Sequence, residues 1–212
     1  MEAWSEPLRW SLSVGKISLL VKAPYTLFVG LLIPVYWRHY GPANFLWFSD
    51  IALLTTLAAL WLESPLLASM QAVSVALLEL LWVADFLAKL LGGIHLTGIS
   101  EYMFKPEHSR FIRGLSLFHL WLPFLLLWMV YRLGYDERAW IAQTLLAWLI
   151  LLLCYFLTKP AENINWVFGP GGQVQTRVAP GLYLVLLMVF FPLCVYFPTH
   201  LVLKAIMPRQ LK

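Results

Sequence analysis

Five titratable side chains interrupt long apolar stretches of this sequence: Asp50, Glu79, Asp85, His119 and Cys154. An ionisable group inside a hydrocarbon layer is costly unless it is paired or hydrated, so each of them indicates a functional site. An imidazole beside carboxylates suits general acid–base chemistry, because the ring can take and return a proton while a carboxylate orients it. We therefore interpret His119 as a general base that Asp50 or Asp85 orients.

Two side chains are candidates for the nucleophile beside such a base. Ser49 directly precedes Asp50, and Cys154 lies in the run Leu-Leu-Leu-Cys-Tyr. A hydroxyl or thiol activated by a neighbouring base can form a covalent intermediate. The alternative for Cys154 is a small apolar core residue.

A purely structural interpretation of the same polar residues stays open. Asp50 and Asp85 can hydrogen-bond Ser, Thr, Trp or Tyr partners in a packed bundle, and His119 can donate to a carbonyl. Two carboxylates and an imidazole would also suit zinc, manganese or iron. Because no His-x-x-His or Glu-x-x-His spacing occurs, we predict no metal site, and the cofactor is left open.

The composition places these residues in a membrane protein. Of 212 residues, 61% are hydrophobic and only 12% are charged, about half the ~25% usual in soluble domains. These values exclude a soluble globular enzyme, a disordered chain and a nucleic-acid binder. The net charge of +4 suits anionic lipid headgroups.

The apolar stretches predict an all-α, polytopic membrane helix bundle, with residues 1–212 as one domain. About 20 apolar residues cross a bilayer, and breakers such as Gly41-Pro42 and Ser64-Pro65 divide the chain. Apolar residues at helical spacing between Arg9 and Lys22 predict a short N-terminal interfacial helix. The six predicted transmembrane helices are 18–37, 43–62, 66–91, 111–133, 138–158 and 180–205.

The order of the spans puts the long connections, 92–110 and 159–179, on one side of the membrane and both termini on the other. Counted at ~1.5 Å per residue, Asp50, Asp85, His119 and Cys154 fall roughly 6 to 12 Å below the long-connection side. Glu79 falls near the midplane, where it could relay protons or form a protonated hydrogen bond. We therefore predict that Asp50, Asp85 and His119 lie within hydrogen-bond or one-water distance of one another.

The connection 159–179 is predicted to cover this pocket. It contains Asn163, Asn165 and Trp166 between two prolines. Two amides beside an indole could bind the ester or phosphate of a substrate while covering its acyl chain. We expect Trp166 to pack between spans and one of the asparagines to bond to the polar residues beneath it. The alternative is a solvated hairpin in which Trp166 only anchors at the interface.

Two stretches, 115–123 (LSLFHLWLP) and 162–169 (ENINWVFG), resemble an uncharacterised group of small six-span bacterial membrane proteins. The chain also resembles the YwaF-type family, which is related to transmembrane acyltransferases. The positions that carry this second likeness are Ser49-Asp50, His119 and Asn165-Trp166. Ser49 stands where that family has a cysteine, so its thiol is missing here. The resemblance implies a bacterial inner-membrane protein.

Three functions follow as hypotheses. The first is a lipid-directed transferase or hydrolase, with the residues named above as its site. The second is a non-catalytic subunit of a membrane complex that binds a pigment, quinone or lipid, and the third is a small transporter. Membrane lipids and other membrane proteins are the expected partners. Lys and Arg are nearly balanced between the two sides, and the basic residues flanking the first and last spans favour cytoplasmic termini.

Overall fold

The computed structural model describes residues 17–171 and 173–208, and in this part of the chain every regular element is helical. This confirms the all-α prediction. Residues 9–16 of the predicted interfacial helix lie outside the described residues. Lys22, at its other end, already belongs to the first turns of the first long helix.

The elements follow the predicted spans closely. In chain order they are α1 (Leu19–Tyr40), η1 (Pro42–Leu46), α2 (Phe48–Leu62), α3 (Pro65–Gly92), η2 (Glu101–Phe104), α4 (Arg110–Ser116), α5 (Phe118–Leu133), α6 (Ala139–Leu157), η3 (Ile164–Trp166), α7 (Pro180–Phe190), the π-helix η4 (Phe191–Tyr196) and α8 (Phe197–Ile206).

Five segments of the described chain are long and apolar enough to cross a membrane: α1, α3, α4 with α5, α6, and the continuous run from α7 through η4 to α8. The second predicted span is shorter than expected. Its α-helix, α2, has 15 residues, because Trp47 is extended and separates it from η1. The chain is therefore an integral membrane protein, and its described residues contain five long apolar segments and one short apolar helix.

Helix α3 forms the centre of the bundle and contacts α2, α5, α6 and α8. All residues from 68 to 76 are buried, so its first half is enclosed on every side. Ala68, Ser69, Ala72, Ser74 and Ala76 line this half. Such small side chains let neighbouring helices approach closely in a membrane protein.

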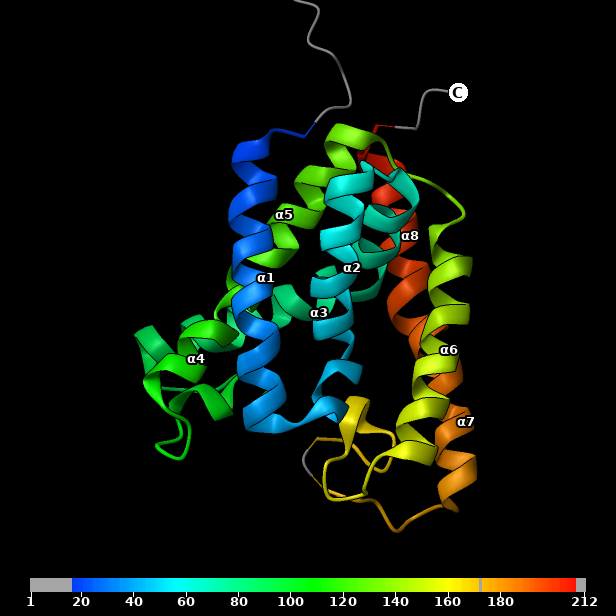
Figure 1. Cartoon of the computed structure of the whole chain (residues 1–212). Coiled ribbons are helices and arrows are strands. Elements are labelled where there is room, and N and C mark those ends of the chain that lie inside the picture. Colours follow the sequence, from blue (N-terminus) through cyan, green and yellow to red (C-terminus); the bar gives the residue numbers. More distant parts are fainter. Residues whose placement is uncertain (1–16, 172, 209–212) are drawn as a thin grey trace, which may run out of the picture.

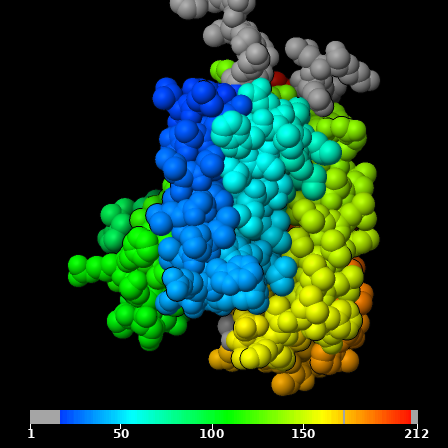
Figure 2. Space-filling model, viewed as in Figure 1, coloured from blue at the N-terminus to red at the C-terminus, as the bar shows by residue number. Residues whose placement is uncertain are grey.

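The two described chain ends lie at the same end of the bundle, as predicted (Figure 1). The connection 159–179 lies at the opposite end. Helix α3 runs obliquely, so its C-terminal end and the following segment lie at the side of the bundle. Figure 2 shows this segment (green) projecting from the main body.

Candidate acid–base site

His119 is held by a carboxylate from the middle of α3. Its Nδ1 lies 2.6 Å from Oε2 of Glu79, and the two side chains are 14% and 5% exposed. The other ring nitrogen, Nε2, has no hydrogen-bond partner among the described residues and is not among their fully buried atoms. With Glu79 ionised, Nδ1–H donates to the carboxylate and Nε2 presents its lone pair. This arrangement can accept and return a proton.

An aromatic wall fixes the orientation of the imidazole. The ring of Trp82 stacks on His119 with centroids 4.8 Å apart and planes inclined by 27°. Trp82 in turn stacks on Phe86 at 5.1 Å and 7°. Since Trp82 lies one turn after Glu79, a single helix supplies both the carboxylate and the stacking ring.

Asp50 lies in the first turn of α2 and is only 4% exposed. Its Oδ2 accepts a hydrogen bond from Asn44 Nδ2 at 3.2 Å, while Oδ1 is buried with no partner among the described residues. Asp50 interacts electrostatically with both His119 and Glu79. It therefore lies close to the same site, but the carboxylate bonded to His119 is that of Glu79 and not, as we predicted, that of an aspartate.

Hydroxyl groups complete the surroundings. Ser116, one turn before His119, lies 2.7 Å from the hydroxyl of Tyr36. Tyr102 of η2 lies beside Ser116 and Trp82, and desolvation raises the pKa of its hydroxyl well above the ordinary value. Tyr102 therefore stays a neutral donor. We call the following residues the polar cluster: Asp50, Glu79, Tyr102, Ser116 and His119.

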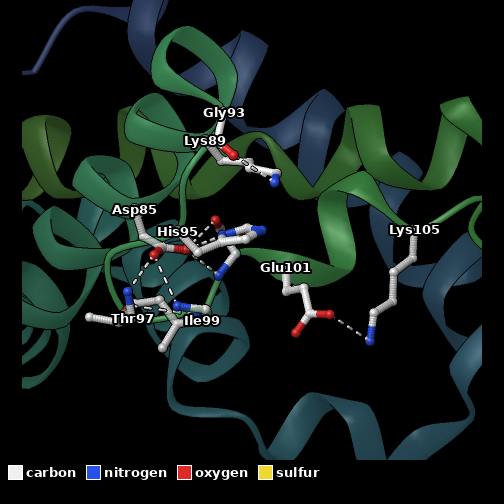
Figure 3. A network of polar contacts seen from close by, with 10 residues as sticks. Asp85, Lys89, Gly93, His95, Thr97, Ile99, Glu101 and Lys105 are labelled. Carbon is white, nitrogen blue, oxygen red and sulfur yellow. Dashed lines mark hydrogen bonds and ion pairs between the residues drawn. The ribbon is translucent and has the colours of Figure 1, made fainter.

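The structure places Asp85 elsewhere, which corrects its predicted catalytic role. Figure 3 shows its carboxylate enclosed by the chain that follows α3. Oδ1 accepts from the backbone N–H of Thr97 (2.6 Å) and Gly98 (2.9 Å). Oδ2 contacts Ser100 through both Oγ (2.5 Å) and N (3.1 Å), and His95 Nδ1 at 3.1 Å. Asp85 therefore fixes a loop, as the structural interpretation proposed.

The prediction that Asp50, Asp85 and His119 lie within hydrogen-bond or one-water distance is not met by direct bonds, because Asp85 bonds to the loop after α3 and His119 bonds to Glu79. It counted residues along helices taken as perpendicular to the membrane. Helix α3 is oblique instead, so its last turns lie at the side of the bundle (Figure 1), and Asp85 belongs to these turns. Where α3 packs against α5, the carboxylate that contacts His119 is that of Glu79.

Asn165 attaches the connection 159–179 to the bundle, mainly through the backbone around the start of α2 and not through Asp50 or His119. Its Oδ1 accepts from Phe48 N at 2.9 Å, and its Nδ2 donates to Leu46 O at 2.7 Å and to Cys154 Sγ at 3.4 Å. Cys154 is fully buried beneath it. The structure thus gives Asn165 and Cys154 roles in packing, and brings neither into hydrogen-bond contact with His119.

Asn163 organises the connection itself. Its Nδ2 donates to Gly169 O and Gly171 O, both at 2.9 Å, and its Oδ1 accepts from Phe168 N at 2.9 Å. Trp166 is 37% exposed, so the expectation that it packs between spans was wrong. The apolar neighbours Ile164 and Val167 are buried in its place, because the positive φ of 51° at Asn165 and 60° at Trp166 turn the chain at this point.

Ser49 is partly buried in the first turn of α2, next to Asp50. Within residues 17–171 and 173–208, no group of three or more His, Cys, Asp or Glu side chains is placed to hold a metal ion.

The sequence reasoning missed three members of the polar cluster as partners of His119. Glu79 was expected near the midplane and apart from His119, although it precedes Trp82 by one turn of α3, and Trp82 is an aromatic residue that can stack on an imidazole. Ser116 had a usable signal, because it precedes His119 by one helical turn. No sequence signal pointed to Tyr102, because only the fold of the segment after α3 brings its side chain to the polar cluster.

Comparisons with protein-family models, with curated proteins and with solved structures find no match to this chain.

Proposed function

We propose that this protein is a membrane-embedded enzyme that hydrolyses or transfers a group of a lipid, with His119 as its general base. The observation that carries the proposal is the short contact between His119 Nδ1 and Glu79 Oε2, which leaves Nε2 unpartnered. A carboxylate at one ring nitrogen fixes the tautomer and stabilises the imidazolium that forms during reaction. Asp85 is assigned no role in this proposal, because its carboxylate is bonded to the loop after α3.

The chemical step follows from this geometry. Nε2 removes a proton from a water molecule or an alcohol as its oxygen bonds to the ester carbon or phosphorus. The bond to the leaving oxygen then breaks, and the imidazolium returns the proton to that oxygen. Atoms and charges balance without a protein nucleophile. Ser49 and Cys154 are therefore not required, which agrees with the serine at the position where the YwaF-type family has its cysteine.

The hydroxyl of Tyr102 is suited to stabilise the transition state. Because it remains protonated, it can donate a hydrogen bond to the oxygen on which negative charge develops. Asp50 adds a carboxylate close to the pair, and its unpartnered Oδ1 can accept a hydrogen bond from an incoming hydroxyl.

The location of the site favours a lipid substrate. Glu79 lies 14 residues from the start of the 28-residue α3, so the cluster sits at the depth of the hydrocarbon layer. A group that reaches Nε2 there comes from a lipid or from water within the bundle. The likeness to a family related to transmembrane acyltransferases points to acyl chemistry. The same lipids are the partners that we propose for the protein, together with an inner-membrane location.

The experiment uses the full chain, purified in mild detergent and reconstituted into vesicles of bacterial polar lipids. Released fatty acids, lysolipids and headgroups are measured by mass spectrometry. We expect time-dependent products from the wild type and a loss of about 10²- to 10⁴-fold in His119→Gln and Glu79→Gln, the range typical of a lost general base. Asp136→Asn is the matched control, because it removes a buried carboxylate that lies outside the polar cluster, in the turn between α5 and α6.

Equal product from His119→Gln and the wild type would overturn the proposal. So would the absence of any lipid product from wild-type vesicles. In that second case, mass spectrometry of proteins that co-purify in mild detergent tests the alternative of a complex subunit.

A further inference from the structure

A groove of about 490 Å³ lies between α1 and α5, on a part of the bundle that faces outward. Helix α1 is the least buried of the five long apolar segments, so this side of the bundle is open to the membrane. Binding sites for small ligands usually have volumes of roughly 300 to 1,000 Å³. The main lining residues are Val21, Pro24, Tyr25 and Phe28 of α1, and Trp121 and Leu125 of α5.

Aromatic contacts produce this groove. The ring centroid of Trp121 lies 5.6 Å from that of Tyr25 and 5.3 Å from that of Phe28, both with edge-to-face geometry. Helix α1 packs mainly against α2 and η1, and α5 packs mainly against α3. Large rings therefore bridge the space between α1 and α5, and they form the floor of the groove.

The lining identifies the ligand as a hydrocarbon chain. No charged side chain lines the groove. The hydroxyl of Tyr25 donates to Leu53 O at 2.7 Å, so this residue presents its ring to the groove. Apolar and aromatic surfaces of this kind bind the apolar part of a ligand, while a few polar groups at the end of a site fix its orientation.

The length of the groove matches one leaflet of a bilayer. Along α1 its lining begins at Leu20, which is 85% exposed, and ends at Phe28. Eight residues of helix correspond to roughly 12 Å, and one leaflet contributes about half of a hydrocarbon layer of ~30 Å. Leu20 lies in the first turn of α1, at the end of the bundle that carries the termini. The groove therefore follows the acyl chains of the leaflet on the termini side.

A basic side chain marks the same end of the groove. Arg132 lies in the last turn of α5, seven residues after Leu125, so both occupy one face of this helix. It is partly buried, and it has no ion pair among the side chains that the structure describes. The other basic side chains described at this end each pair with a carboxylate: Lys22 with Glu63, Arg138 with Asp136, and Lys204 with Glu137. The charge of Arg132 is thus available to an anion at the headgroup level.

We propose that the groove between α1 and α5 binds one acyl chain of an anionic phospholipid, whose phosphate pairs with Arg132. A phospholipid joins an apolar chain to a phosphate through its glycerol, and the groove and Arg132 follow each other in that order along α5. None of the groove residues belongs to the polar cluster. The lipid site is therefore independent of the function proposed above.

Native mass spectrometry of the full-length protein in mild detergent tests the site. The probes are phosphatidylglycerol and phosphatidylcholine with identical acyl chains, added in equal amounts. We expect one bound phosphatidylglycerol per protein and a preference of about fivefold over phosphatidylcholine, the usual effect of one basic side chain on an anionic lipid. Equal binding of the two lipids would overturn the proposal.

A substitution that fills the groove tests where the chain binds. Val21→Trp should lower phosphatidylglycerol binding by about tenfold or more, because the indole displaces several methylene groups of the chain. Val185→Trp is the matched control, since Val185 is 54% exposed on α7, away from the groove. Melting temperatures show whether both variants are folded. Equal lipid binding by the two folded variants would overturn the proposal.

A second variant tests the headgroup contact and does not depend on the folding of Val21→Trp. Arg132→Gln should remove the preference for phosphatidylglycerol and leave phosphatidylcholine binding unchanged. Lys159→Gln is the control, because it removes an equal charge from an exposed side chain at the opposite end of the bundle. An unchanged preference in Arg132→Gln, or an equal loss in Lys159→Gln, would overturn the assignment.

The same spectra report a different occupant. A dimer without bound lipid that dissociates in Val21→Trp would place a second copy of the chain in the groove and overturn the proposal. Lipid binding should persist in His119→Gln, because that variant changes the polar cluster and not the groove. A failure of the vesicle assay is therefore distinguishable from a failure of the lipid site.

Discussion

Asn165 caps helix α2 through Phe48, although these two residues are 117 positions apart in the chain. Its side-chain oxygen accepts the N–H of Phe48 at 2.9 Å, at the first residue of that helix. Trp47, the residue that precedes α2, has no side-chain hydrogen bond of its own to this end. A loop from the second half of the molecule therefore supplies the cap that the local sequence lacks.

Replacement of Asn165 by Ala should lower the free energy of unfolding by about 1 to 2 kcal/mol, the usual effect of a lost helix cap. Asn165→Asp should also be destabilising, because its carboxylate keeps the acceptor for Phe48 N but loses the amide that donates to Leu46 O. Thermal or denaturant unfolding in detergent measures both variants. If Asn165→Ala has the stability of the wild type, the connection 159–179 only joins two helices.

The bond between His119 and Glu79 should appear as coupling between the two residues. Each single variant, His119→Gln or Glu79→Gln, breaks a buried pair and should cost about 3 to 5 kcal/mol. The double variant should cost less than the sum by roughly 1 to 3 kcal/mol. Additive effects in this double-mutant cycle would contradict the pairing.

Asp85 should control the order of the segment after α3. Asp85→Asn removes the charge that several donors share, and a hydrogen bond to a charged group contributes about 1.5 to 3 kcal/mol. We expect hydrogen exchange at the amides of Thr97, Gly98 and Ser100 to accelerate by about tenfold or more, because each 1.4 kcal/mol is a factor of ten. Exchange in α6 serves as the control. Equal acceleration there would indicate global destabilisation instead.

The ion pair between Asp136 and Arg138, in the turn between α5 and α6, should make the free energy of unfolding depend on pH in the acidic range. Arg138 bonds to Asp136 through Nη2 (2.8 Å) and Nε (3.1 Å). These bonds lower the pKa of Asp136 below its usual value of about 3.9 in the folded protein. The stabilisation is therefore complete above about pH 4 and is lost as the pH falls through the lowered pKa.

Melting temperatures between pH 6 and pH 2.5 test this sign. Asp136→Asn should flatten the acid side of the profile relative to the wild type, and Arg138→Gln should shift the loss to higher pH. The effect should be small, because the Arg138 side chain is 77% exposed. An unchanged acid profile in both variants would refute the assignment.

The sequence by itself determined that this is a helical membrane protein and where several of its long helices begin and end. Long apolar runs and Gly-Pro breakers act locally, so boundaries such as Pro65 for α3 and Pro180 for α7 could be read directly. It also identified His119 and Asp50, because an ionisable residue in an apolar run is conspicuous whatever the fold.

Only the tertiary structure decided which polar residues meet. Depth along a helix predicts contact only when helices are parallel. Because α3 runs obliquely, His119 bonds to Glu79 and not to Asp85. Tyr102 reaches the cluster because the segment after α3 folds back, which no periodicity reveals. Asn165 reached the start of α2 for the same reason: hydrogen bonds between distant segments depend on how the helices pack, and packing is a property of the whole chain.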